Sequence, residues 1–319
     1  MNTSLKQKIT SSLLVAIIGD ALGVPVESTP RNELSLCSVK NMLGYGRYDQ
    51  PQGTWSDDTS MLLCTMESFL NGSYDLENLG KIFCEWIFDA RWTPDGYVFD
   101  SGLTTFLALD RIRNGGISAK NSGCSSEEDN GNGSLMRILP AALYFHREET
   151  DDFLRHIHEV SSITHAHPRS LLGCGIYALF VRELLATDDK MKALRAATTK
   201  TLAFYENHPD FSTELSNFMR ILSLSIHECE ESEINSSGYI VDTLEASIWC
   251  FFRHDTSRDI ILAAVNLGLD TDTTGVVAGG LAGLCHGTDS IPTEWIESLA
   301  LKNEIRDILN RFSELVVAS

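Results

Sequence analysis

Apolar residues recur at spacings of three and four along most of the chain, the pattern of helices that bury one face. Such helices are predicted at 9–24, 61–70, 75–91, 103–109, 150–163, 170–186, 189–206, 211–228, 238–252, 260–267 and 292–316. Alternating strand patterns are scarce, and no internal repeat, low-complexity tract or domain linker is evident. We therefore predict an all-α fold in which residues 1–319 form a single domain of many packed helices.

The hydrophobic content and the net charge of the chain limit the kinds of partner that are expected. Hydrophobic residues make up 43% of the 319 residues, which is ample for a globular core. The net charge of −19 opposes nonspecific binding to nucleic acid or to an anionic membrane, so neither is expected as a partner. The net charge does not exclude an anionic substrate, because bound metal ions could neutralise the charge of that substrate locally.

The cysteines and the N-terminus indicate a cytoplasmic protein. The eight cysteines are scattered without a CxxC pair, as free thiols of a reducing compartment are. Lys6 and Lys8 precede an apolar run at 13–18, which imitates a weak signal peptide. The run is short and Asp20 interrupts it, so we interpret it as a core helix. No stretch reaches the about 20 apolar residues of a membrane span.

One acidic stretch lies at 266–275 and introduces a helix of small apolar residues. Gly275, Gly279 and Gly283 share one face of that helix, where another backbone can approach closely. Asp270 and Asp272 stand at its start. One acid is well explained as a helix cap, but two suit a hard divalent cation, which prefers carboxylate and hydroxyl oxygens. Capping and metal binding are both open on this stretch alone.

A second acidic stretch at 53–60 has the same layout and favours the metal. Ser56, Asp57 and Asp58 stand before the apolar helix at 61–70. Adjacent buried carboxylates repel each other unless a positive charge lies between them. The two acidic helix starts could therefore face each other across a two-metal site. The alternative is two independent caps at the surface.

Other candidate residues are weaker alone. Asp100 is either a helix cap or a functional acid, and Glu27 is an acid in an apolar setting. The glycine-rich loop that ends at Gly131–Ser134 offers bare amides to an anion such as a diphosphate. His165 is expected to face substrate or to be structural, since the proposed metal site is rich in oxygen rather than nitrogen.

Taken together and in this order, these motifs resemble the ADP-ribosylglycohydrolase family, from about residue 12 to 287. That family includes the dinitrogenase-reductase-activating glycohydrolase and the ADP-ribosyl-acceptor hydrolases. The motifs are Gly19–Gly23 with Glu27, Trp55–Thr59, Phe99–Gly102, Gly131–Arg137 and Asn266–Gly287. The resemblance implies an all-helical fold, two Mg²⁺ or Mn²⁺ ions in a cleft, and hydrolysis of the glycosidic bond between ADP-ribose and an acceptor.

The resemblance also implies roles for single residues. The implied metal ligands are Ser56, Asp57, Asp58, Asp270, Asp272 and Thr273. Asp58, Glu27 and Asp100 are the candidate catalytic acids; Glu27 corresponds to a glutamate near the metals and Asp100 to an acid by the distal ribose. The predicted substrate-binding residues are Gly102, Gly131, Asn132, Gly133, Ser134, Met136 and His165.

Two positions depart from the family pattern. Leu269 stands where glycine or another small residue is usual, and Ser56 stands where threonine is common. A serine hydroxyl still coordinates a metal, whereas Leu269 affects the geometry of its loop.

The sequence favours ADP-ribosyl-arginine on a protein as substrate, because an acidic protein suits a cationic guanidinium and no residue is an obvious acid for a serine leaving group. The alternatives are serine-linked or small-molecule ADP-ribose, another metal-dependent hydrolase such as a phosphatase or nucleoside hydrolase, and a non-catalytic relative that binds ADP-ribose.

Overall fold

The computed structural model describes residues 4–72 and 74–318, and these contain helices and loops without a β-strand. Its only β-pairing in the described chain is two isolated bridges, Tyr45 with Gln50 and Cys124 with His165. The all-α prediction is therefore confirmed. The helices form two compact units, the first made of the chain up to Thr59 and from Ser225 onward, the second of Ser60–Leu224. The single domain stays a prediction.

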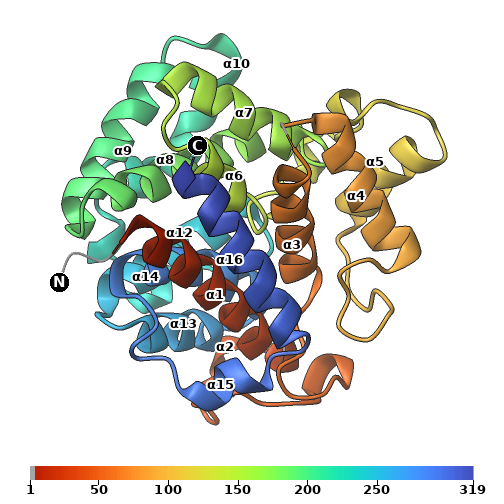
Figure 1. The fold of residues 1–319 in the computed structure, drawn as a ribbon. Coiled ribbons are helices and arrows are strands. Elements are labelled where there is room, and N and C mark those ends of the chain that lie inside the picture. Colours follow the sequence, from red (N-terminus) through yellow and green to blue (C-terminus); the bar gives the residue numbers. More distant parts are fainter. Residues whose placement is uncertain (1–3, 73, 319) are drawn as a thin grey trace. The chain divides into compact units, whose positions relative to one another are not determined.

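The first unit contains the first and the last described residues, 4 and 318 (Figure 1). Its α-helices are α1 (Leu5–Gly23), α2 (Arg31–Leu34), α12 (Ile240–Arg253), α13 (Ser257–Asn266), α14 (Thr271–His286), α15 (Thr293–Ser298) and α16 (Lys302–Ala318). Short 3-10 helices lie at Val24–Val26, Gly46–Tyr48, Ile226–Glu228 and Glu231–Glu233. Helix α3 (Asp57–Leu70) begins in this unit and continues into the second.

The second unit is built from the middle of the chain, drawn from orange through green to turquoise in Figure 1. Its further α-helices are α4 (Leu76–Asp89), α5 (Leu103–Arg113), α6 (Leu139–Tyr144), α7 (Thr150–Ser162), α8 (Pro168–Ala186), α9 (Lys190–Tyr205), α10 (Pro209–Ser212) and α11 (Met219–Leu222). Its 3-10 helices lie at Ala119–Asn121, Glu127–Asp129 and Glu214–Phe218.

Helices α1 and α14 pack along each other in the core of the first unit, and glycines make this possible (Figure 1). A Cβ atom on Gly275 would lie 2.6 Å from the Gly19 carbonyl oxygen, and one on Gly283 would lie 2.3 Å from that of Ser11. The predicted glycine face thus contacts another backbone, as expected. Burial of both helices offsets the cost of glycine in a helix, about 1 kcal/mol each relative to alanine.

The stretch Leu5–Val26 is long and apolar enough to cross a membrane by length and composition, contrary to the expectation that none is. In the protein, however, 83% of its apolar window is buried. Its contacts with α14 and α16 account for that burial, so the interpretation of this segment as a core helix is confirmed.

Two predicted helices are wrong in extent. The segment 211–228 is divided among α10, α11 and 3-10 helices, and the segment 292–316 is divided into α15 and α16. At the second break Leu301, the residue directly before α16, has a φ of 51°, in the left-handed region that a continuous right-handed helix does not contain. There the Ala300 amide donates to the Gly53 carbonyl at 3.0 Å, and the Trp55 indole donates to the Ala300 carbonyl at 3.1 Å. These tertiary bonds replace helical ones.

The eight cysteines are free thiols, as predicted. Most are buried in the helical core, and Cys37 is exposed.

Candidate active site

Asp20, near the end of α1, holds the first turn of α3 in place. Its carboxylate is fully buried and accepts hydrogen bonds from the amides of Ser56 (3.0 Å) and Thr59 (2.9 Å). These are the amides that a helix start leaves without intrahelical partners. Burial raises the pKa of Asp20 to about 6, against the lowering effect of these bonds. Asp20 therefore positions the Ser56–Asp58 turn through hydrogen bonds to its backbone.

Asp58 connects the two acidic stretches. Its Oδ2 atom accepts hydrogen bonds from the Ser56 hydroxyl and from the Thr273 hydroxyl, each at 3.3 Å. Ser56, Asp58 and Thr273 are all nearly fully buried. The predicted meeting of the two helix starts is therefore present within the first unit, and the alternative of two independent surface caps is wrong.

Asp272 lies at the centre of this acidic cluster. Burial raises its pKa well above the usual aspartate value, and the negative charges of Asp58, Asp270, Glu27 and Asp20 raise it further. Carboxylate oxygens of Glu27 and Asp272 lie within 4.8 Å of each other. Burying several carboxylates close together costs free energy because their negative charges repel one another. A cation bound among them would relieve this repulsion.

Capping does not explain Asp270, because its side chain makes no capping hydrogen bond although it stands at the N-cap position of α14. Its backbone amide donates to the Ser236 carbonyl at 3.0 Å, and a Cβ on Gly238 would lie 3.1 Å from its Oδ2 atom. Asp272 caps only its neighbour, accepting from the Thr273 amide at 2.9 Å. Asp57, the first residue of α3, is buried beside this cluster.

The loop before Asp270 explains the unusual Leu269. This residue has a φ of 61°, in the left-handed region where glycine is favoured, and its side chain is 44% exposed. Its amide donates to the Thr29 carbonyl at 2.8 Å, and its carbonyl accepts from the Ser28 amide at 2.6 Å. These two bonds connect the chain after Glu27 to the chain before Asp270. Leucine thus keeps the backbone geometry that a small residue would adopt without strain.

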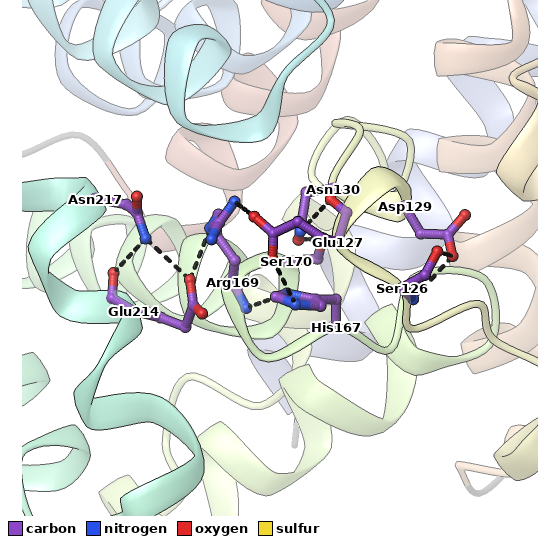
Figure 2. Close-up of polar contacts among 9 residues, drawn as sticks. All are labelled: Ser126, Glu127, Asp129, Asn130, His167, Arg169, Ser170, Glu214 and Asn217. Carbon is purple, nitrogen blue, oxygen red and sulfur yellow. Dashed lines mark hydrogen bonds and ion pairs between the residues drawn. The ribbon is translucent and has the colours of Figure 1, made fainter.

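In the second unit, the loop before Gly131 is held by a polar network from the start of α8 (Figure 2). Arg169 contacts Glu127 at 2.6 Å and Glu214 at 2.7 Å. Asn130, the residue before Gly131, accepts a bond from the Ser170 hydroxyl at 3.0 Å and donates to the Glu127 carbonyl. Hydrogen bonds to Ser170 and Glu127 therefore hold Asn130 at the entry to the predicted ligand loop.

The structure brings Gly133 and His165 together. A Cβ on Gly133 would lie 2.8 Å from His165 Cε1 and 3.0 Å from the hydroxyl oxygen of Thr105, so only glycine fits there. Ser134 is fully buried, and its hydroxyl accepts a bond from the Ser161 hydroxyl at 2.8 Å. Its side chain thus belongs to the core of the second unit.

The remaining predicted residues are placed as follows. Asp100 is half-buried and does not cap α5, because the N-cap of α5 is Gly102, which is exposed. The helix-cap alternative for Asp100 is therefore wrong. Asn132 and Met136 are buried, and the Met136 amide donates to the Asn132 carbonyl at 3.1 Å, which closes the turn after Gly131.

Two residues with evident roles were not among the predicted site residues. Asp20 orients the Ser56–Asp58 turn, and Thr105 has a buried hydroxyl oxygen beside Gly133 that lacks a hydrogen-bond partner in the described chain. The signal for Asp20 was its place as an acid inside an apolar helix. The sequence held no signal for Thr105, since a threonine within a helix is ordinary.

The donor set of the first unit fits a hard divalent cation. Its donors are the carboxylates around Asp272 and the hydroxyls of Ser56 and Thr273, so oxygen predominates. Burial raises the pKa of Asp272, and the negative charges of the neighbouring acids raise it further, so a cation is favoured beside it. We conclude that this acidic cluster could hold a metal.

An all-α fold and a buried, oxygen-rich acidic cluster that could hold a cation define the structural class of this protein. Comparison with known proteins narrows this class. The ADP-ribosylglycohydrolase family model matches residues 1–318. The chain therefore belongs to the ADP-ribosylglycohydrolase family, and it is an enzyme that hydrolyses the bond between ADP-ribose and an acceptor.

Individual relatives agree with this family. The chain is 30% identical over 306 residues to the ADP-ribosylarginine hydrolase Tri1 of Serratia proteamaculans, covering 94% of this chain and 77% of that protein. It is also 30% identical to the ADP-ribosyl-[dinitrogen reductase] glycohydrolase of Rhodospirillum rubrum, covering 98% and 97%. A solved structure described as an ADP-ribosylglycohydrolase-related protein complex matches with a TM-score of 0.80 and 28% identity, covering 98% and 99%.

Proposed function

We propose that this enzyme removes ADP-ribose from arginine side chains of proteins with the help of two Mg²⁺ or Mn²⁺ ions. The observation that carries the metal part is the buried acidic cluster around Asp272, where burial and the charges of the neighbouring acids raise the pKa of Asp272 well above its usual value. The acceptor part is supported by two relatives named for ADP-ribosylarginine and for ADP-ribosyl-dinitrogen reductase. The strongly acidic chain also suits a cationic guanidinium.

The proposed ligands are Ser56, Asp57, Asp58, Asp270, Asp272 and Thr273. When bound, the metal ions would supply positive charge to the ribose hydroxyls and to the attacking water.

The protein's own residues have separate tasks in this proposal. Asp58 is oriented by the Ser56 and Thr273 hydroxyls, and Glu27 lies beside Asp272, so either carboxylate is placed to take a proton from the attacking water. The glycine loop at Gly131–Ser134 holds the diphosphate with backbone amides. Asp100 is proposed to lie by the distal ribose, where the guanidinium leaves. A protonated guanidine leaves without a strong general acid.

The cellular setting of this proposal is the cytoplasm, where reduced thiols persist; the free cysteines support it. The substrate is an ADP-ribosylated protein or conjugate. Neither nucleic acid nor a membrane is proposed as a partner, because the net charge is −19.

The test is a turnover panel with peptides that carry ADP-ribose on arginine or on serine, and with nucleobase-linked ADP-ribose, at equal concentration under Mg²⁺. We expect fastest release from arginine, loss of turnover after chelation, and recovery with Mg²⁺ or Mn²⁺. Faster release from serine would overturn the acceptor, and full turnover without metal would overturn the mechanism. A protein that binds ADP-ribose but turns over none of the substrates would be a non-catalytic relative.

Asp100→Ala tests the acceptor side separately. We expect it to reduce arginine turnover, whereas Asp95→Ala, which removes an equal charge from an exposed position in the same segment, should not. Equal activity of both variants would show that Asp100 has no part in the reaction.

A further inference from the structure

Arg137 is a buried cation without a carboxylate beside it. Its side chain is fully buried, donates to the Val160 carbonyl at 3.1 Å, and lies 4.4 Å from the centre of the Phe83 ring. Within residues 4–72 and 74–318 no acid forms an ion pair with it. Burial lowers the pKa of Arg137 to about 10, which leaves it cationic at neutral pH. A buried positive charge of this kind favours an anion nearby.

This guanidinium determines the direction of the next hydrogen bond. Arg137 donates to the Thr164 hydroxyl oxygen at 2.8 Å, and an arginine has no acceptor to offer in return. The same oxygen lies 2.8 Å from Nδ1 of His165. Thr164 is fully buried, and in the described chain its hydroxyl proton has Nδ1 as its one acceptor. Leaving that proton unbonded would be costly, so Thr164 donates to Nδ1.

The direction of that hydrogen bond determines the tautomer of the His165 ring. Burial, together with the nearby Arg137 charge, lowers the pKa of His165 to about 3, so the ring is neutral at neutral pH. A neutral imidazole carries one proton, and a ring whose Nδ1 accepts carries it on Nε2. His165 is thereby a hydrogen-bond donor at Nε2.

The Nε2–H group of His165 lies next to Gly133 in the predicted ligand loop. A Cβ on Gly133 would lie 3.3 Å from His165 Nε2 and 3.0 Å from the Thr105 hydroxyl oxygen. The Thr105 oxygen is buried and lacks a partner among the described residues. Two polar side chains thus converge on the place where glycine replaces a side chain, and one of them has capacity for a further bond.

We infer that Arg137 and Thr164 are positioning residues that hold His165 in its Nε2–H form, so that it donates to a phosphate oxygen of the ligand beside Gly133. The ligand half rests on the proposed function, which supplies a diphosphate. The hydrogen-bond half rests on the protein alone and is measurable without substrate. A hydrogen-bond donor would be rejected by this Nε2–H, whereas an anionic oxygen would also gain from the Arg137 charge behind it.

The first test is nitrogen NMR of the full-length protein labelled at histidine, with His165→Gln to assign the signal. The wild type and Thr164→Ser should show His165 with an Nε2–H proton, and Thr164→Val should show a mixture of both tautomers. An Nδ1–H ring in the wild type, or an unchanged ring in a folded Thr164→Val, would overturn the inference. The wild-type spectrum is decisive even if the valine variant does not fold.

The second test is calorimetric binding of ADP-ribose. Thr164→Val should weaken binding by about tenfold, as loss of one hydrogen bond to a charged group does, while Thr164→Ser should retain it. Equal affinity of all three proteins would overturn the ligand half. A wild type with the Nε2–H ring that does not bind ADP-ribose would instead contradict the proposed function, so the two failures are distinguishable.

Discussion

The Thr273 hydroxyl donates to the Asp58 carboxylate across 3.3 Å, and this bond joins two helix starts that are 215 residues apart in the chain. It brings one acidic motif beside the other within a single compact unit. Asp272 directly precedes Thr273 on the same turn of α14, and the negative charges of four neighbouring acids act on it.

Asp272→Asn is expected to separate metal binding from folding. Removing one buried negative charge relieves repulsion from its four neighbours, so the metal-free variant should melt at the same temperature as the metal-free wild type or higher. Loss of a carboxylate ligand should also reduce the rise in melting temperature that Mn²⁺ produces in the wild type. Calorimetric melting at pH 8, with chelator and with Mn²⁺, measures both effects.

Asp289→Asn is the matched control, because it changes an exposed aspartate by the same atoms. It should respond to Mn²⁺ as the wild type does. A variant at position 272 that keeps the full Mn²⁺ response would contradict the assignment of Asp272 as a ligand.

Much of the acidic cluster of the first unit could be predicted, because the proposed ligands lie in two short motifs that begin helices. The sequence could not predict which distant segments of the chain pack against each other. Asp20 was visible only as an acid in an apolar helix, and its bonds to Ser56 and Thr59 depend on how α1 packs. Similarly, the break between α15 and α16 arises from bonds to Gly53 and Trp55, which lie far away in sequence and leave no local signal.

Gly279→Ala is expected to destabilise the protein strongly. The added Cβ would lie 2.6 Å from the Val15 carbonyl oxygen and 3.0 Å from the Ala16 Cα, and these backbone atoms cannot rotate away. Overpacking of this kind costs about 1–3 kcal/mol or more, which exceeds the about 1 kcal/mol that alanine gains in a helix. Urea unfolding measures the loss as a lower midpoint.

Gly102→Ala provides the comparison for stability. Gly102 has a φ of −68°, and the nearest atom to its added Cβ would be the Thr105 hydroxyl oxygen at 3.8 Å. Its unfolding midpoint should stay close to that of the wild type. If both glycine variants unfold at the same urea concentration, the close contact of α1 with α14 does not carry the expected cost.

His158 is expected to make stability depend on pH. Its Nε2 atom lies 2.7 Å from the Tyr205 hydroxyl oxygen, and burial lowers its pKa from 6.5 to about 3. As the pH falls below 6.5, the His158 imidazole binds a proton in the unfolded chain but stays neutral in the folded protein. The contribution of His158 to stability is therefore present above pH 6.5 and is lost toward pH 3, by about 1.4 kcal/mol per pH unit.

Because Asp20 and Asp272 have raised pKa values and act in the opposite sense, the comparison must be with His158→Gln. The stability of the wild type relative to this variant should decrease by roughly 2–3 kcal/mol between pH 7 and pH 4.5. A difference that is independent of pH would show that His158 titrates normally in the folded protein.

Arg31 is expected to support the metal site without touching it. Its guanidinium donates to the carbonyls of Leu267 (2.9 Å), Glu231 (2.6 Å) and Ile234 (2.6 Å). It therefore ties the chain after Glu27 to the loop before Asp270 and to the segment 231–234. A planar fork that serves three carbonyls cannot be replaced by the single ammonium of lysine.

Arg31→Met should consequently lower the unfolding free energy by about 1–3 kcal/mol, since it removes three hydrogen bonds to backbone carbonyls, and Arg31→Lys should recover only part of this. Arg47→Met is the matched control, because Arg47 is exposed and should tolerate the change. Urea unfolding gives the stability, and titration with Mn²⁺ gives the affinity of the folded protein. If Arg31→Met weakens Mn²⁺ binding while folded, the loop geometry that it maintains is needed to aim Asp270 and Asp272. If Mn²⁺ affinity stays at the wild-type value, Arg31 serves only the fold.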